Sequence, residues 1–375
     1  MKVAMIGWEY PPLFSGGLGV HCQAIVRELT GLGIHIDFYL PSDGQTKFDI
    51  PERMALYRVE LPHSSSAYNT GVTWEAVQQF RSLLEESFIP DGIDIIHAHD
   101  WMGVFAATRI SRIHNIPLIW TVHSTESDRA AGMLPHAGIL AIEQEAFRNV
   151  NHTITVSKRT KQYLVDYYHA DPAKTTVIYN GLDAAPFKQM SNRDYQQNAG
   201  HILFLGRVTD QKGPGNFLEA ARMVLAETNV RFMIAGDGDL LSILRRRARR
   251  WRIDDRIEFT GNVLGDQWLN CYRNAIMFVL PAVSEPFGIT VLEAMAAGLP
   301  TIISTATGAG EIVKNTLKVE PNNPKELAQT ILVLLNNHHL RRTFGQNGAQ
   351  EALRWTWKRV ALHTQSLYQE VLRNK

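Results

Sequence analysis

The N-terminal stretch of the chain reads KVAMIGWEYPPLFSGGLGVHCQAIVREL over residues 2–29. It opens with a short apolar run, passes through a glycine-rich turn, and ends with apolar residues at helical spacing. A strand buried on both faces of a parallel sheet is a continuous apolar run, whereas a helix repeats its apolar residues about every 3.6 positions. The stretch therefore predicts a buried parallel strand followed by an amphipathic helix.

The same rhythm returns along the chain in two series, which a polar stretch over residues 188–200 separates. Because helical patterns follow the strands, each series predicts a doubly wound parallel sheet. We expect an α/β protein with two Rossmann-like domains, over residues 1–185 and 198–352, that face each other across a cleft. The expected strands span residues 2–6, 34–40, 93–98, 118–122 and 153–156, and then 202–205, 230–235, 257–260, 277–280 and 301–304.

The segment over residues 353–375 follows the second series and repeats large apolar residues at helical spacing, among them Trp357, Val360, Leu367 and Tyr368. Such a pattern is typical of an amphipathic helix that buries one face. We expect this helix to cross back to the N-terminal domain.

Bulk composition excludes several classes of protein. The chain carries 38 Lys and Arg against 37 Asp and Glu, so no global field recruits nucleic acid or an anionic membrane. Cys22 and Cys271 lack the spacing of a disulfide framework or a structural zinc site. No apolar run approaches the roughly 20 residues that a membrane helix needs. We expect a cytoplasmic protein whose partners bind at local sites.

Glycines cluster between the first strand and the first helix, at Gly16, Gly17 and Gly19. Glycine lets the backbone approach an anion, and a helix N-terminus offers unpaired N–H groups and the positive end of a dipole. Gly16 and Gly17 are therefore a candidate phosphate-binding turn. The competing interpretation is a tight strand-to-helix turn without a ligand.

Polar clusters follow two predicted strands and read HAHDW over residues 97–101 and TVHSTESDR over residues 121–129. Open α/β sheets bind ligands at the carboxyl ends of their strands, so Asp100 and His123 are candidates for hydrogen bonds to ligand hydroxyls such as those of a sugar. We expect His97 and His99 to point to opposite sides of their strand. We therefore predict no metal site there.

The second series opens with Arg207 and Lys212, which follow the end of a predicted strand. Arginine offers a planar fork of donors and lysine a compact charge, a pair suited to holding a diphosphate and stabilising it as it leaves. The alternative is a pair of surface cations that caps a helix.

The most specific stretch reads SEPFGITVLEAMAAGLP over residues 284–300. Glu285 follows an apolar strand, the Gly288 region opens a helix, and Glu293 lies on that helix. First-turn amides can face a phosphate and a carboxylate can accept both hydroxyls of a ribose. Two acids in an otherwise apolar segment have no evident role in a core.

Together these residues resemble the retaining glycosyltransferases of family four, which have the GT-B fold, over nearly the whole chain. Residues 8–12, 97–101 and 123–126 look most like the glycogen and starch synthase branch. The resemblance rests on Glu285 and Glu293, on Arg207 and Lys212, on Gly16 and Gly17, on the NGLD segment over residues 180–183, and on the closing segment with Trp355 and Trp357.

The resemblance implies transfer of a hexosyl group, here glucosyl, from a UDP- or ADP-sugar to an acceptor hydroxyl with retention of configuration. The N-terminal domain would serve the acceptor, and the C-terminal domain would bind the nucleotide sugar. The acceptor would be a carbohydrate, as in glycogen synthase, and no metal or other cofactor is expected. The implied catalytic residues are His123, Asp100, Arg207, Lys212 and Glu285; the implied donor-binding residues are Gly16, Gly17, Asn180, Gly288, Ile289, Thr290 and Glu293.

Three alternatives remain open at this point. The first is a nucleotide-sugar epimerase of similar architecture, which needs no acceptor. The second is a family-four transferase that acts on a lipid or a small molecule. The third is a nucleic-acid-binding module that uses the basic run from Arg245 to Arg252, although the chain shows no aromatic platform beside it.

Two motifs need a choice between a functional and a structural interpretation. Asp237 and Asp239 match the DxD pattern that holds a metal in other glycosyltransferases, but they follow a strand, and we interpret them as part of a glycine-rich turn. The arginine run has a leucine stripe, Leu240, Leu241 and Leu244, which favours a solvated basic helix over peripheral membrane attachment.

Overall fold

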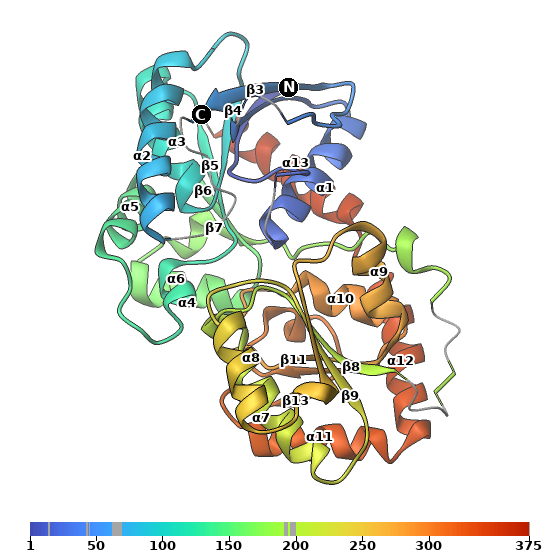
Figure 1. Ribbon diagram of the computed structural model, residues 1–375. Coiled ribbons are helices and arrows are strands. Elements are labelled where there is room, and N and C mark those ends of the chain that lie inside the picture. Colours follow the sequence, from blue (N-terminus) through green and yellow to red (C-terminus); the bar gives the residue numbers. More distant parts are fainter. Residues whose placement is uncertain are drawn as a thin grey trace. The chain divides into compact units, whose positions relative to one another are not determined.

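The computed structural model describes residues 1–13, 16–42, 44, 46–61, 70–190, 194–195 and 200–374. The chain divides into two compact units (Figure 1). Unit 1 comprises Met1–Gly181 and Trp357–Lys375, and unit 2 comprises Leu182–Thr356. Unit 2 thus begins a few residues before the boundary expected at residue 185, and the expected polar linker lies partly outside the described residues.

Unit 1 is built on a seven-stranded parallel sheet in the order β3-β2-β1-β4-β5-β6-β7. The sequence order reverses between β1 and β4. These two strands pair directly, with Val3 opposite Ile95. The strands are β1 (Lys2–Ile6), β2 (His35–Ser42), β3 (Met54–Glu60), β4 (Ile95–His99), β5 (Leu118–Val122), β6 (His152–Thr155) and β7 (Thr175–Val177).

Helices cover both faces of this sheet (Figure 1). Helices α2, α3, α5 and α6 contribute to one apolar core, whereas α1 packs against α13. The helices of unit 1 are α1 (Gly17–Gly31), α2 (Thr70–Ser87), α3 (Asp100–His114), α4 (Glu126–Ala130), α5 (Ala137–Asn149), α6 (Lys158–Tyr168), the short η1 (Pro172–Lys174) and α13 (Trp357–Arg373).

The C-terminal helix α13 is part of unit 1 although unit 2 precedes it in the chain. Its buried residues include Trp357, Val360, Leu367 and Tyr368, as the helical spacing in the sequence predicts. The Tyr368 hydroxyl lies 2.6 Å from Nδ1 of His97 on β4, so α13 also makes a polar contact inside the unit.

Unit 2 repeats the architecture with a six-stranded parallel sheet in the order β10-β9-β8-β11-β12-β13. Its sequence order reverses between β8 and β11. The strands are β8 (His201–Leu205), β9 (Arg231–Ala235), β10 (Ile257–Gly261), β11 (Ala275–Leu280), β12 (Thr301–Ser304) and β13 (Leu317–Val319). The predicted α/β class with two doubly wound parallel sheets is confirmed.

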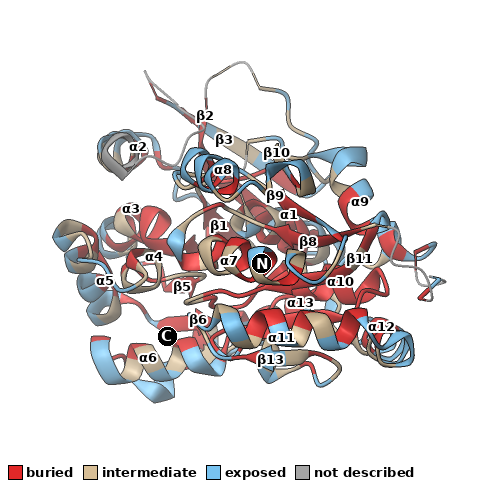
Figure 2. Cartoon of the chain, turned by 60° about the horizontal axis from the view of Figure 1, so that its bottom comes forward, coloured by how far each residue is buried: buried red, intermediate tan, exposed pale blue. Residues whose placement is uncertain are grey.

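The helices of unit 2 are mostly amphipathic, with buried stripes that Figure 2 shows in red. Among the described residues, no helix is long and apolar enough to cross a membrane. The helices are η2 (Ala185–Phe187), η3 (Asp210–Lys212), α7 (Pro214–Leu225), α8 (Leu241–Arg250), η4 (Asp254–Arg256), α9 (Gly265–Arg273), α10 (Ile289–Ala296), η5 (Gly308–Glu311), α11 (Pro324–Leu335) and α12 (His338–Ala352).

Candidate functional site

In each unit the predicted site residues gather at the carboxyl ends of the strands where the strand order reverses. In unit 1 that point lies between β1 and β4, and in unit 2 between β8 and β11. The helices on the two sides of such a point run to opposite faces of the sheet, so a crevice opens where ligands bind in proteins of this class.

Asp100 begins α3 directly after β4 and adopts a φ of 52°, in the left-handed region that few residues other than glycine visit. Its carboxylate oxygen Oδ1 accepts hydrogen bonds from the backbone amides of His123, at 2.7 Å, and Ser124, at 3.2 Å. The Asp100 carbonyl accepts from Trp120 Nε1 at 3.1 Å. Asp100 therefore fixes the loop after β5 that carries His123.

His97 and His99 lie on the same face of β4, with ring centroids 4.4 Å apart. The expectation that they point to opposite sides was wrong, because residues two apart on a strand share a face. Both nitrogens of His97 lie close to hydroxyls, those of Tyr368 at 2.6 Å and Thr121 at 2.7 Å. Burial lowers the pKa of His97 to about 3, so its imidazole is neutral at physiological pH. His97 has a structural role.

His123, the predicted contact for the transferring sugar, lies beside His99, whose Nδ1 is 3.1 Å from His123 Nε2. His21 of α1 packs edge-on against His123, with ring centroids 4.4 Å apart. Burial, followed by the neighbouring imidazoles, lowers the pKa of His21, His99 and His123 below the usual range. Three neutral imidazoles therefore meet at this point of unit 1.

Sequence reasoning missed His21. Part of the signal was present: Leu18, Cys22 and Ile25 are among the apolar residues at helical spacing, and His21 follows Leu18 by three positions, so it lies on the same helix face. The structure buries His21, and its Nδ1 lies 2.8 Å from Oδ1 of Asn180. Asn180, predicted to bind the donor, thus contacts a histidine of unit 1.

The glycine turn before α1 lies next to a buried acid. Gly16 is the N-cap residue of α1 and Gly17 its first residue. The carboxylate of Glu9 accepts the backbone N–H of Gly19 at 3.0 Å. This carboxylate takes one of the amides that would face a phosphate and repels a second anion. The phosphate-binding role of Gly16 and Gly17 stays a prediction, and Glu9 opposes it.

In unit 2, the predicted catalytic residues Lys212 and Glu285 form a largely buried ion pair between Lys212 Nζ and Glu285 Oε2. Lys212 ends η3, in the turn after β8, and Glu285 lies in the loop after β11. The carbonyl of Gln211 accepts the amides of Val283, at 2.9 Å, and Ser284, at 3.2 Å, which joins turn and loop. Arg207 donates to the Gln211 side chain at 3.2 Å.

Gly213 allows this close approach. It has a φ of 69°, and a Cβ atom there would collide with the carbonyl oxygen of Pro281, at the start of the loop that carries Glu285. Only glycine satisfies both demands. The turn after β8 and the loop after β11 are therefore held together at the backbone, and the same two segments carry Lys212 and Glu285.

Helix α10 starts beside this ion pair. Gly288 is its N-cap residue with a φ of 94°, and Ile289 and Thr290 are its first two residues. The amides of a first helical turn have no partner inside the helix and attract anions. Because Glu285 Oε1 accepts the amide of Phe287 at 3.4 Å, the acid and the helix N-terminus form one group.

Glu293 lies further along α10 and is buried. Its Oε2 accepts a hydrogen bond of 2.6 Å from the Tyr272 hydroxyl of α9. Burial raises the pKa of Glu293 to about 7, although its hydrogen bonds with Tyr272 and Trp268 act in the opposite direction. The expectation that the two acids of this segment have no role in a core needs correction, since Glu285 has a lysine and Glu293 a tyrosine as partners.

Sequence comparison places the chain among known enzymes. The model of Glycosyltransferase Family 4 matches residues 15–185, and that of Glycosyl transferases group 1 matches residues 189–351. A glycosyltransferase of Methanocaldococcus jannaschii, itself uncharacterized, is 31% identical over 98% of this chain and 98% of its own length. The chain belongs to the family-four glycosyltransferases.

Two further comparisons concern a relative in sequence and a solved structure. Glycogen synthase of Mycobacterium tuberculosis is 27% identical to this glycosyltransferase, over 98% of the chain and 94% of the synthase. Among solved structures, sucrose-phosphate synthase from Thermosynechococcus elongatus has a TM-score of 0.84 with 21% identity and covers 100% of both chains. The GT-B fold that the sequence predicted is thereby confirmed.

Two remaining motifs of the glycosyltransferase have local partners. Asp237 and Asp239 lie in the turn between β9 and α8, where the Asp237 carboxylate accepts the amide of Gly238 at 2.8 Å. On α8 the buried residues are Leu241, Leu244 and Ala248, and the arginines are exposed (Figure 2). Arg245 donates to the Phe259 carbonyl at 3.0 Å. The segment with Asp237 and Asp239 therefore forms a turn, and the arginine run forms an amphipathic helix with its arginines in solvent.

Proposed function

We propose that this glycosyltransferase transfers a glucosyl-type hexosyl group from a UDP- or ADP-sugar to an acceptor hydroxyl, with retention of configuration and without a metal ion. The observation that carries the proposal is the Lys212–Glu285 pair beside the N-terminus of α10. It combines a cation and helix amides, which suit a diphosphate, with a carboxylate that suits sugar hydroxyls. One place in unit 2 thus offers partners for both parts of a nucleotide sugar.

The chemical step breaks the bond between the anomeric carbon and the diphosphate oxygen, and negative charge develops on the leaving phosphate. Lys212, Arg207 and the amides of Gly288, Ile289 and Thr290 would stabilise that charge more strongly in the transition state than in the bound donor. In the mechanism that the family resemblance implies, the departing phosphate takes the acceptor proton on the same face of the sugar. No covalent nucleophile is then required.

His123 and Asp100 of unit 1 would act on the sugar that is transferred. His123 is neutral, its ring is restrained by His99 and its backbone amide by the Asp100 carboxylate, so it can offer a defined hydrogen bond to a sugar hydroxyl. The Asp100 carboxylate would accept a hydrogen bond from a hydroxyl of that sugar. Orienting groups of this kind lower the entropic part of the barrier.

The glycogen synthase relative supports an α-glucan as the acceptor. A small-molecule or lipid acceptor is the second candidate. We also propose a cytoplasmic location, in keeping with two buried free cysteines, Cys22 and Cys271, in the described part of the chain.

Release of nucleoside diphosphate from UDP-glucose and ADP-glucose, measured with and without α-glucan, tests the proposal. We expect release that depends on acceptor and continues in EDTA, because lysine, arginine and helix amides supply the positive charge that a bound metal would otherwise provide. Interconversion of sugars without acceptor would indicate an epimerase. Loss of transfer in EDTA that magnesium or manganese restores would contradict metal independence and return attention to Asp237 and Asp239.

Glu293 gives the nucleotide affinity a pH dependence. Its pKa of about 7 means that the carboxylate that would accept ribose hydroxyls is mostly protonated at pH 6. We expect affinity for the free nucleoside diphosphate to be about tenfold weaker at pH 6 than at pH 8, since one pKa unit corresponds to a tenfold change. Isothermal titration calorimetry at both pH values measures this.

The Glu293→Gln variant is the matched control for that profile. It should bind the nucleotide more weakly and show a flat pH profile between pH 6 and 8. Because folding raises the pKa of Glu293, its contribution to stability is present below the unfolded-state pKa and is lost as pH rises through about 7. The variant should therefore be no less stable than the parent at pH 8. An unchanged pH profile in the variant would exclude Glu293 from the ribose site.

A further inference from the structure

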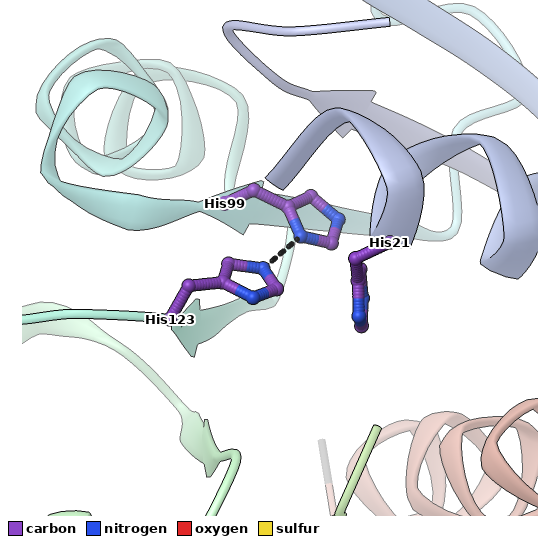
Figure 3. A group of neighbouring side chains, drawn as sticks. All are labelled: His21, His99 and His123. Atoms are coloured by element: carbon purple, nitrogen blue, oxygen red, sulfur yellow. Dashed lines mark hydrogen bonds between the residues drawn. The ribbon is translucent and has the colours of Figure 1, made fainter. Parts of the chain in front are cut away.

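Three histidines from separate elements converge in unit 1 (Figure 3). His21 comes from α1, His99 ends β4, and His123 follows β5. Each offers one ring nitrogen such that the three nitrogens lie within 4.8 Å of one another. Such convergence of three imidazoles needs an explanation, because burying polar rings costs free energy unless their nitrogens find partners.

The hydrogen bond to Asn180 determines which nitrogen of His21 is available. Oδ1 of Asn180 is an acceptor and lies 2.8 Å from Nδ1 of His21, so Nδ1 carries the proton. The other nitrogen, Nε2, then presents a lone pair. This is the arrangement of a metal-binding histidine whose second nitrogen donates to an acceptor outside the metal site.

The other two rings leave a nitrogen unsatisfied. His99 Nδ1 and His123 Nε2 lie 3.1 Å apart. Both imidazoles are neutral, so one of these two nitrogens donates its proton to the other. Within the described residues, Nε2 of His99 is fully buried and has no hydrogen-bond partner. An unsatisfied buried polar atom costs about 1–3 kcal/mol. The neighbouring His97, by contrast, has a partner for both nitrogens and is not part of the group.

Two carboxylates lie near the segments that carry these histidines. The Asp100 carboxylate accepts the backbone amide of His123. Asp100 and Glu9 both act electrostatically on Cys22, the residue after His21. A divalent cation that entered this region would find two carboxylates to compensate part of its charge.

We propose that His21, His99 and His123 bind a divalent transition-metal ion of the Zn²⁺ class. Zn–N bonds of about 2.0–2.1 Å in a tetrahedral site bring ligand nitrogens to roughly 3.3 Å from one another, so the rings must move together by modest side-chain rotations. The fourth position remains for water. Because His123 is the proposed sugar contact, the bound ion inhibits transfer and is not a cofactor of it.

Metal binding itself does not rest on the proposed function, and the experiment that tests it needs no activity. The full-length chain, stripped with a chelator, is titrated with Co²⁺ and then with Zn²⁺. We expect one equivalent of Co²⁺ to give the intense visible bands of a four-coordinate nitrogen site, and Zn²⁺ to abolish them. A wild-type protein without these bands, or without stoichiometric Zn²⁺ binding in calorimetry, would overturn the proposal.

Variants locate the ion. His99→Gln and His21→Gln should each abolish the bands, and circular dichroism shows whether each variant is folded. Asn180→Ala leaves the ligands in place but removes the acceptor of His21, and should weaken the affinity about tenfold or more. The matched control replaces the exposed His338 and His339 of α12, whose rings lie 4.1 Å apart, with glutamine. Bands that survive the first two changes, or disappear in the control, would contradict the assignment.

The inhibitory consequence does rest on the proposed function and is tested separately. Zn²⁺ added at one equivalent should reduce acceptor-dependent release of nucleoside diphosphate, and EDTA should restore it. If the chain shows no transfer at all, the proposed function fails while the Co²⁺ spectrum still decides the metal site. If Zn²⁺ binds and transfer continues unchanged, His123 is not the sugar contact and inhibition is excluded.

Discussion

A Lys212→Met variant is expected to lose a hundredfold or more of kcat, with a much smaller change in KM. Methionine keeps the length and the apolar stem and removes only the charge. One charge-assisted contact to a developing anion contributes on the order of 3 kcal/mol to the transition state. Steady-state kinetics with UDP-glucose or ADP-glucose, whichever supports transfer, measures the effect. A kcat near that of the parent would remove Lys212 from the leaving-group site.

The ion pair with Glu285 complicates this experiment, because the variant leaves a buried carboxylate without its lysine. The double variant Lys212→Met/Glu285→Gln separates the two effects, since it removes both charges. We expect it to regain stability and to remain inactive. The matched control is Lys318→Met, which removes an exposed lysine of the same unit that donates to the Gly310 carbonyl. That variant should keep both kcat and stability.

Arg129→Met should destabilise unit 1 by about 3–5 kcal/mol, the usual cost of removing one partner from a buried ion pair. Arg129 contacts the Glu126 carboxylate at 3.1 Å and that of Glu143 at 3.0 Å. It also donates to the Ser124 carbonyl at 2.9 Å, next to His123. Urea denaturation followed by near-ultraviolet circular dichroism measures the loss. A change below 1 kcal/mol would show that this cluster does not hold the loop after β5.

The same variant should be sensitive to pH. Burial already raises the pKa of Glu143 to about 7 although Arg129 acts in the opposite direction. A raised pKa means that the group favours folding below its unfolded value and opposes it as pH rises through about 7. Without Arg129 the loss should therefore be larger at pH 8 than at pH 5. Arg112→Met, which affects an exposed arginine on α3, is the control and should show neither effect.

The central strands could be predicted from sequence because burial on both faces leaves a continuous apolar run. Strands β1, β5 and β12 have the predicted bounds, and the other predicted strands differ only at their ends. Strands β3, β7 and β13 were missed. All three are edge strands: β3 has only two buried residues, Met54 and Val59, and β7 and β13 have only 3 residues each. Partial burial and short length remove the apolar signal.

For the candidate site, the sequence predicts which residues take part but not which of them contact one another. Lys212 and Glu285 could be named from sequence because each follows a strand, but their ion pair depends on strand order, which brings β8 next to β11. The roles of two other residues could not be predicted, because they depend on the folded structure. Glu9 opposes an anion at the first glycine turn through its bond to Gly19, and Arg129 holds the loop after β5 through its bond to the Ser124 carbonyl. His21 could have been found from helical spacing alone.

The central claim is that unit 2 binds the nucleotide sugar with Glu293 at the ribose and Glu285 at the sugar. Glu293 would serve a part of the donor that does not change, so Glu293→Gln should lose about 1.5–3 kcal/mol of affinity and keep kcat. Glu285 would favour the cation-like sugar of the transition state, so Glu285→Gln should lose kcat and keep its affinity for the free diphosphate.

Calorimetry of the nucleoside diphosphate with the parent and both variants, run beside steady-state kinetics, is the most direct test of this claim. The account predicts weakened diphosphate binding in Glu293→Gln and near-parental binding in Glu285→Gln. Weakened binding in Glu285→Gln with unchanged binding in Glu293→Gln would contradict it.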